Sequence, residues 1–435
     1  MSTLHPLSHG TPLSEFDIFS VPPTQLSVKY DIETEHRPLQ PITPDRLVQF
    51  EFTTAPNEYV KWCDTELFLT ARVVIYPVGN KLEADSWEHF ELEDNLMHTM
   101  IQSVDLSING RLVTKASVNY AYRAYFDNYL GYDKSAKEGH LSSVVYQDIS
   151  RSRYVPSDLT SVVGPYFEMR GKLCIDIAQQ GRAMLGGLKF KLEIRFNKPV
   201  YGFNRKGTKL PFEVQLEVGN TSLFVHRAIV SEGTLVAHTK ALQHATAKYP
   251  ITRHEVQGVT IPGGIMDIML DRIFNGQLPR RALVGFVRST AFNGDYSRSP
   301  FIFEHFELNH LTFTIDGISF PRTPYQPNFE KKLYMREYYA FLQTYNQDGP
   351  SSCLDLTYEE YMEQEKILLA YNFAPDLGDG YGFGGHLSLI KQGAFGLHVR
   401  FAQPLKEPIV AIVFAEFDNL IQINKDLQVF TDYVV

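Results

Sequence analysis

Hydrophobic and polar residues alternate just after position 103, where Val104, Leu106 and Ile108 are separated by polar side chains. A period of two predicts a β-strand with one buried face. Asn109-Gly110 follows directly, and both residues tolerate the positive φ that a two-residue type I′ turn requires. The stretch therefore predicts a β-hairpin.

A helical pattern follows the returning strand of this hairpin. Aromatic residues recur there at i, i+3, i+4 and i+7, which is the spacing of one helix face. These residues are Tyr122, Tyr125, Phe126 and Tyr129. Aromatic side chains at this spacing usually pack against a sheet, with tyrosine hydroxyls at the solvent rim. We therefore expect this face to belong to a core.

The hairpin and the helix occur a second time, about half the chain later. In residues 311–320 an Asp-Gly pair takes the turn, so Ile315 should face Ile318 and Phe313 should face Phe320. The other face of this hairpin carries Thr312, Thr314 and Ser319. The helix that follows presents five residues on one side, namely Met335, Tyr338, Tyr339, Leu342 and Tyr345.

A third repeated feature supports a duplication. The sequence Leu-Glu-Ile-Arg-Phe at 192–196 returns as Leu-His-Val-Arg-Phe at 397–401. A double glycine precedes each copy, at 186–187 and at 384–385. Because the three features keep their order and nearly one offset, they indicate two domains of one fold in tandem.

Short strands, frequent turn residues and few helices predict an all-β protein. About eight strands per repeat would form a jelly roll, so we expect two tandem jelly-roll β-sandwiches with short helices in the inter-strand loops. The expected divisions are an extended N-terminal arm over 1–44, a first jelly roll over 45–232, a linker helix over 233–249 and a second jelly roll over 250–435. The linker should end before Pro250, because proline disfavours helical geometry in the preceding residue.

Composition and charge say little about the fold, but they restrict the classes of function that the protein can have. The net charge of −9 and the sequence pI of about 5.9 argue against a surface that holds nucleic acid, and the arm is acidic as well. The acidic run EHFELED over 88–94 should be a solvated helix start or loop. Cys63, Cys174 and Cys353 are far apart and form no C-x-x-C, which fits free thiols in a reducing compartment. We expect no signal peptide and no membrane-spanning segment, and folding in the cytosol.

The chain contains no convincing sequence motif for catalysis, cofactor binding or metal binding. It has no G-x-S-x-G elbow, Walker loop or H-E-x-x-H, so we assign no catalytic, cofactor-binding or metal residue and expect no cofactor. His238 and His244 would project from opposite sides of a helix and do not form a ligand pair. Asp376 and Asp379 flank a glycine-rich loop and could hold Ca²⁺, although Asp in such a loop is more often turn chemistry.

The two aromatic helices also do not predict a nucleobase-stacking surface. Stacking surfaces carry interleaved cations, and the basic residues here are only Arg123 and Arg336. Packing in a core is the better interpretation of both helices.

Several stretches resemble one known family, the hexon-like major capsid proteins of Polinton (Maverick) elements and adintoviruses. The stretches are FSVPPTQ (19–25), AHTKALQHATAKYPITR (237–253), IFNGQLPRRALVGFV (273–287), AFNGDYSRSPFIF (291–303) and AEFDNLIQINKD (415–426). The resemblance spans nearly the whole chain, and the part over 237–303 is the most specific.

This resemblance implies a double jelly-roll major capsid protein of the virion. Such proteins assemble as homotrimers that tile an icosahedral shell around double-stranded DNA, with single jelly-roll penton proteins at the five-fold vertices. The expected partners are therefore neighbouring capsomers, the penton protein and minor capsid proteins, without sequence-specific nucleic-acid binding. The segment from Met184 to Leu188 resembles a target of the maturation protease of such elements. Glycines directly before a core strand favour a structural bend instead.

Two other classes of function remain open from the sequence. One is a soluble tandem β-sandwich that binds carbohydrate or serves as an adaptor, which should form a monomer or a small oligomer. The other is a two-domain jelly-roll hydrolase or oxidoreductase, which should bring His, Asp or Glu residues together in one cleft.

Overall fold

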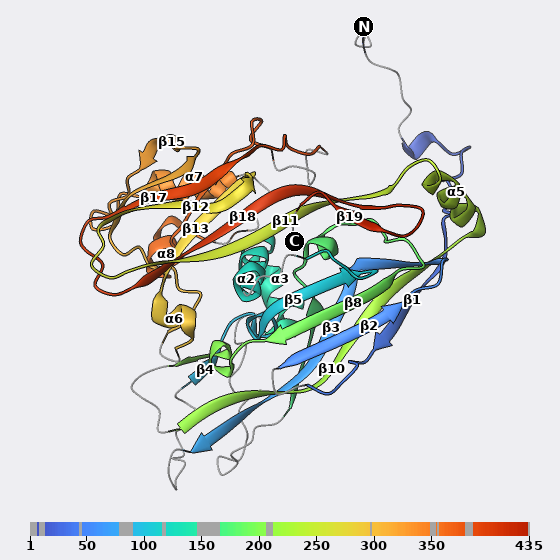
Figure 1. Cartoon of the computed structure of the whole chain (residues 1–435), viewed down its shortest axis with the longest axis horizontal. Coiled ribbons are helices and arrows are strands. Elements are labelled where there is room, and N and C mark those ends of the chain that lie inside the picture. Colours follow the sequence, from blue (N-terminus) through green and yellow to red (C-terminus); the bar gives the residue numbers. More distant parts are fainter. Residues whose placement is uncertain are drawn as a thin grey trace.

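The computed structural model describes most of the chain. The described residues are 14–42, 46–77, 90–114, 119–145, 166–205, 212–295, 298–348, 356–378 and 386–433, together with Leu7 and Leu354. Antiparallel sheets dominate, and they pair into two sandwiches that lie at opposite ends of the molecule (Figure 1).

The first sandwich consists of two four-stranded sheets, ordered β1-β10-β3-β7 and β2-β8-β5-β6. Its strands are β1 (Val28–His36), β2 (Leu47–Thr53), β3 (Glu58–Pro77), β5 (Ile101–Ile108), β6 (Arg111–Leu112), β7 (Phe167–Lys172), β8 (Lys189–Phe196) and β10 (Phe212–Val230). A separate two-stranded sheet joins β4 (Phe90–Leu92) and β9 (Phe203–Arg205).

The second sandwich repeats this arrangement, with sheets ordered β11-β18-β13-β16 and β12-β17-β14-β15. Strand β19 (Val429–Thr431) adds to β18. The other strands are β11 (Ala247–Ile261), β12 (Asp267–Gln277), β13 (Arg281–Arg288), β14 (Leu308–Ile315), β15 (Ile318–Tyr325), β16 (Leu368–Asn372), β17 (Gln392–Phe401) and β18 (Ile409–Ile423).

Both sandwiches share one topology. When the eight strands of each half are numbered along the chain, one sheet has the order 1-8-3-6 and the other 2-7-4-5. The two halves are therefore copies of one eight-stranded sandwich, as the repeated features predicted.

The repeated hairpins occupy equivalent places in this topology. Asn109 and Gly110 have φ of 49° and 79°, and Asp316 and Gly317 have φ of 48° and 80°, so both turns use two left-handed residues. The predicted pairs, Ile315 with Ile318 and Phe313 with Phe320, are present. The repeated Arg-Phe strands are β8 and β17, which take the same position in their sheets.

The N-terminal part of the first sandwich begins earlier than expected. Residues 28–36, expected within the arm, form β1 and pair with β10 along its last part. Without β1 the first half would lack the equivalent of β11. The alternation of Val28, Tyr30 and Ile32 with polar residues is a short strand pattern that the prolines and charges around it conceal.

The expected linker helix is shorter than 233–249. Helix α5 (Glu232–Leu242) is capped by Ser231, whose hydroxyl accepts a hydrogen bond from the backbone N–H of Thr234. Residues 247–249 already belong to β11, and Pro250 lies inside that strand, opposite Leu420. Proline is tolerated there because β11 pairs with β18 alone and forms an edge of its sheet.

The remaining helices are short and, apart from η1 before β1, lie in connections between strands. They are α1 (Leu96–Thr99), α2 (Tyr120–Gly131), α3 (Lys134–Glu138), α6 (Ser289–Asn293), α7 (Met335–Thr344) and α8 (Tyr358–Glu363), with 3-10 turns η1 (Ser14–Phe16), η3 (His140–Val144), η4 (Asp176–Gln179) and η5 (Pro199–Gly202).

The buried face of α7 differs from the predicted one. Of the five predicted residues, Tyr345 is buried and Tyr338 and Leu342 pack in part against the core, as expected, but Met335 and Tyr339 are exposed. Glu337, Phe341 and Thr344 are buried in their place. The buried face is rotated relative to the aromatic stripe and includes Glu337, which accepts a hydrogen bond from the backbone N–H of Gln326. Periodicity of aromatic residues alone did not detect this.

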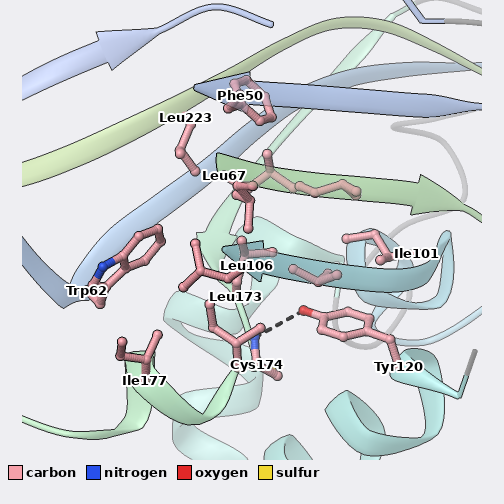
Figure 2. Close-up of a cluster of buried hydrophobic side chains, with 14 of the residues drawn as sticks. Phe50, Trp62, Leu67, Ile101, Leu106, Tyr120, Leu173, Cys174, Ile177 and Leu223 are labelled. Atoms are coloured by element: carbon pink, nitrogen blue, oxygen red, sulfur yellow. Dashed lines mark hydrogen bonds between the residues drawn. The ribbon is translucent and has the colours of Figure 1, made fainter. Parts of the chain in front are cut away.

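The core of the first sandwich is built from both of its sheets (Figure 2). Phe50, Trp62 and Leu67 meet Leu106 there, and all four are almost fully buried. The backbone N–H of Cys174 donates to the Tyr120 hydroxyl at 3.0 Å, which ties the start of α2 to this core.

The core of the first sandwich also contains residues from strands of the second half. The far end of the β11–β18 pair contributes Tyr249, Ile251, Ile421 and Ile423 to the first core, and Tyr433 follows them. In Figure 1 these two long strands run from one sandwich to the other. The strands of the second half thus complete the first half.

Candidate functional site

Helix α2 follows the first hairpin in sequence but packs its aromatic face into the core of the second sandwich. Tyr125 stacks on Phe301 with ring centroids 4.9 Å apart. Phe126 lies 5.5 Å from Phe303 and 5.3 Å from Phe414 by the same measure. The expected core packing of α2 is confirmed, and the structure shows that the core belongs to the other half.

The tyrosine hydroxyls of α2 do not lie at a solvent rim. The Tyr125 hydroxyl accepts a hydrogen bond of 2.7 Å from the Lys366 ammonium, whose nitrogen also lies 5.0 Å from the Tyr125 ring centroid. Burial raises the pKa of Tyr125 well above its ordinary value and lowers that of Lys366. We call the region around α2 (Tyr120–Gly131), where this helix and its neighbours join the two sandwiches, the seam.

The polar side of α2 carries a buried ionic network. The Arg123 guanidinium lies 2.7 Å from the Asp176 carboxylate and 3.5 Å from that of Asp127. The His254 Nδ1 lies 3.2 Å from the other Asp127 oxygen. Arg123 and Asp127 come from α2, Asp176 from η4 and His254 from β11, so the network joins the two halves.

Electrostatics keep Arg123 and Asp127 ionised in spite of their burial. Burial alone would raise the pKa of Asp127, but His254 and Arg123 hold it below its ordinary value. Burial alone would lower the pKa of Arg123, but Asp176 and Asp127 raise it. Removing one member would leave an unpaired buried charge, which is far more costly than the intact network.

A buried His–Asp pair is also the orienting half of a catalytic triad, so the neighbouring nucleophiles matter. Burial raises the pKa of the Cys174 thiol, and Asp127 raises it further. A thiol held protonated is a poor nucleophile. Burial lowers the pKa of His98 to about 4, and this ring shares a hydrogen bond of 3.0 Å with the Tyr120 hydroxyl. These groups fit a structural role at the seam.

Glu93 is a further seam residue that the sequence led us to place in solvent. It belongs to the acidic run over 88–94, expected to be a solvated helix start or loop. The structure buries Glu93, whose carboxylate accepts a hydrogen bond of 2.8 Å from the Ser299 hydroxyl of the second half. Burial raises the pKa of Glu93 to about 7.

The histidines and aspartates considered for metal binding are dispersed. His238 shares a hydrogen bond of 3.0 Å with the Tyr59 hydroxyl, and His244 is exposed. Asp376 pairs with His386 at 2.7 Å, whereas Asp379 lies outside the described residues. Within the described ranges, His, Cys, Asp and Glu side chains form no group of three or more that could hold a metal ion.

The segment that resembles a protease target is packed into the first sandwich. Met184 bridges to Val60 through two backbone hydrogen bonds, and both Met184 and Leu188 are fully buried. A side chain at Gly186 would clash with the carbonyl oxygens of Ala55 and Pro56, and Gly187 has φ of 81°. The expected bend is present here, while the second double glycine, at 384–385, lies outside the described residues.

Sequence reasoning missed the seam for two physical reasons. Arg123 and Asp127 stand at i and i+4, a pairing visible in the sequence, but we considered Arg123 only as a stacking cation. His254 gave no local signal, because its partners come from elements far away in the chain. The part of the chain that the structure describes also contains no helix long and apolar enough to cross a bilayer.

The amino-acid sequence is distantly similar to that of a known protein. No family model matches the chain. An uncharacterized protein of Caenorhabditis elegans is 23% identical over 363 residues, which cover 80% of this chain and 83% of that protein.

Solved structures match over nearly the whole length. The Sputnik virophage structure aligns with a TM-score of 0.61 at 8% identity, covering 98% of this chain and 93% of that chain. The mavirus major capsid protein aligns with a TM-score of 0.57 at 10% identity, covering 99% of this chain and 95% of that chain. The chain has the double jelly-roll fold.

The Faustovirus major capsid protein matches in the same way, with a TM-score of 0.59 at 9% identity over 93% of this chain and 92% of that chain. Identities this low show a shared fold. The double jelly roll expected from the repeated features is confirmed, and the solved structures that share this fold include major capsid proteins of giant viruses and virophages.

Proposed function

We propose that this double jelly-roll protein is a major capsid protein whose chains assemble as trimers and tile an icosahedral shell around double-stranded DNA. The observation that carries the proposal is that 93–99% of the chain, and so both sandwiches, aligns with major capsid proteins. The shared fold supports this function.

The geometry of the chain supports a three-fold assembly. Two like sandwiches in one chain give three chains six similar units, so a trimer acquires a nearly hexagonal outline that can repeat around its perimeter. The ionic and aromatic seam fixes the two sandwiches relative to each other, which a tile of constant shape requires.

The role that we propose is structural rather than catalytic. The ionisable groups around Asp127 and His254 join the two halves, and each of them pairs with another member of the network. The proposed location is the virion, with neighbouring capsomers, a single jelly-roll penton protein and minor capsid proteins as partners. Origin from a Polinton or adintovirus-type element is part of the proposal and rests on the sequence stretches named above.

Light scattering and negative-stain microscopy of the purified full chain test the proposal. We expect a mass near three times 49.7 kDa and particles of hexagonal outline, alone or in shells. A monomer whose mass does not change with concentration would contradict the proposal, and binding of that monomer to a glycan array would favour the carbohydrate-binding alternative.

A further inference from the structure

A groove of about 330 Å³ opens beneath α5, at the edge of the first sandwich. This volume lies at the lower end of the range for ligand pockets, which is about 300–1,000 Å³. Its walls are mainly apolar, and include Leu185, Ala241, Leu242 and Ala245. Tyr249 forms part of the lining, with its hydroxyl accepting a hydrogen bond from the backbone N–H of Leu185.

The groove exists because α5 does not settle onto the sandwich. None of the residues of α5 is fully buried. Its apolar residues Leu235 and Leu242 pack in part against the first core, and His238 stacks on Tyr59. Figure 1 shows α5 at the edge of the molecule, away from the seam. A helix with apolar residues and no buried face is a surface available to a partner.

The rim of the groove is basic. Arg182 and Lys248 line it, and the Arg182 guanidinium donates a hydrogen bond of 2.7 Å to the backbone oxygen of Lys248. His238 stands beside them, held by the Tyr59 hydroxyl. A segment that fits the groove should therefore combine apolar side chains with negative charge.

The N-terminal arm has this composition over residues 14–26. Its large apolar side chains are 71–95% exposed and are Phe16, Ile18, Phe19, Val21 and Leu26. The segment contains Glu15 and Asp17 and no Lys or Arg. Its two consecutive prolines favour an extended polyproline conformation, which loses little entropy when it binds in a groove.

The arm leaves the body of the protein beside α5. The backbone N–H of Ser231, the residue that caps α5, donates a hydrogen bond of 2.9 Å to the oxygen of Ser27. Lys29 forms an ion pair of 3.1 Å with Glu232. The apolar residues of the arm are exposed although the groove of the same chain is near, so the arm does not fill its own groove in this structure.

We propose that residues 14–26 of one chain bind in the groove beneath α5 of a second copy. Apolar side chains of the arm enter between α5 and the start of β11, and Glu15 and Asp17 face Arg182 and Lys248. The proposal rests on the proposed assembly of copies, and it assigns the docking site that this assembly uses for the arm.

Disulfide trapping between full-length chains tests the proposal. One chain carries Phe19→Cys and the other Ala241→Cys, both at exposed positions where the fold tolerates a change. After mixing and mild oxidation we expect at least about tenfold more covalent dimer than in a control that pairs Phe19→Cys with Leu333→Cys, an exposed position on the second sandwich. The control also measures the background from the native cysteines.

A peptide of residues 14–26 supplies the competition arm of the experiment. In excess, it should reduce the covalent dimer severalfold, whereas the same peptide with Phe16, Ile18 and Phe19 changed to Ser should not. A yield equal to the control overturns the proposal. So does a cross-link that forms only within one chain when both cysteines are in the same molecule.

Light scattering of the same samples separates this proposal from the proposed function. A trimer without specific cross-linking overturns the docking site and leaves the capsid assembly standing. Specific cross-linking that the peptide reduces, in a sample whose mass never reaches three chains, supports the docking site and overturns the trimer.

Discussion

Glu93 shows how one buried carboxyl can make the junction of the two sandwiches depend on pH. Its pKa is raised from 4.5 to about 7 by burial, and its partner is the Ser299 hydroxyl rather than a cation. A carboxyl with a higher pKa in the folded chain binds its proton more tightly there. Its contribution to stability is therefore fully present below pH 4.5 and is lost as the pH rises through about 7.

The substitution Glu93→Gln should remove this dependence, because a neutral amide replaces the protonated acid. At pH 8 we expect the variant to be more stable than the parent by about 2–3 kcal/mol, since each pKa unit corresponds to roughly 1.4 kcal/mol. Near pH 4 the two should be alike. Urea unfolding at both pH values measures this, with the exposed Glu359→Gln as the control. Equal stability at pH 8 would show that Glu93 ionises freely.

At Gly186, the addition of a single methyl group should lower the stability of the fold. The Cβ of an alanine there would overlap the backbone oxygens of Ala55 and Pro56, which cannot move aside as a side-chain tip can. Overpacking of this kind costs about 1–3 kcal/mol, so Gly186→Ala should lower the free energy of unfolding by that amount.

The nearby Gly181→Ala is the matched control, since its added Cβ meets no atom within 4 Å. Its effect should be neutral or slightly stabilising, because alanine restricts the unfolded chain. Similar losses at both positions would mean that the clash is not the cause.

At the scale of elements, α2 holds the two halves together, and its aromatic face tests this. Phe126→Ala removes a fully buried ring that contacts Phe303 and Phe414. Such truncations cost about 3–5 kcal/mol. Hydrogen exchange should show a greater loss of amide protection in β13 and β18 than in β5 and β8, although α2 directly follows the first half's hairpin in sequence.

Tyr339→Ala on α7 provides the comparison, because this ring is about half exposed and should cost less than 1 kcal/mol. If Phe126→Ala instead loosened β5 and β8 preferentially, α2 would belong to the first core.

Elements with a local pattern could be predicted from the sequence. Both hairpins followed from alternation and from Asn-Gly or Asp-Gly at the turn, and the equivalence of β8 and β17 followed from a repeated string of residues. β1 and the early start of β11 escaped because prolines and charges mask them. The partner of α2 escaped for a different reason, since the choice between two similar cores is decided by contacts across the chain.

The candidate site was less predictable than the fold. Burial of Glu93 reversed the expectation for an acidic run, because a charged sequence does not show which carboxylate faces a neighbouring sandwich. The Arg123–Asp127 spacing was readable, but Asp176 and His254 become their partners only after folding. Long-range ionic networks have no period in the sequence.

At the scale of the whole molecule, the placement of β1 separates two functions of the N-terminal region. Deleting residues 1–26 removes the exposed segment 14–26 and leaves β1 intact, so the melting temperature should stay within about 3 °C of the parent while assembly weakens. Deleting residues 1–40 removes an edge strand of the first sandwich and should destabilise the fold as well.

Differential scanning fluorimetry and light scattering on both deletions, beside the full chain, measure the two effects. If the shorter deletion assembled as well as the full chain, the arm would have no part in contacts between copies.

The exchange of strands between the cores also has a consequence for synthesis on the ribosome. The first core includes Ile421, Ile423 and Tyr433, which follow the last strand of the first half by about 200 residues. At roughly 5–20 residues per second these residues emerge about 10–40 s later. A nascent first sandwich therefore presents an unfinished apolar edge until residues 421–433 have emerged, and a chain terminated before them keeps that edge open to chaperones and proteases.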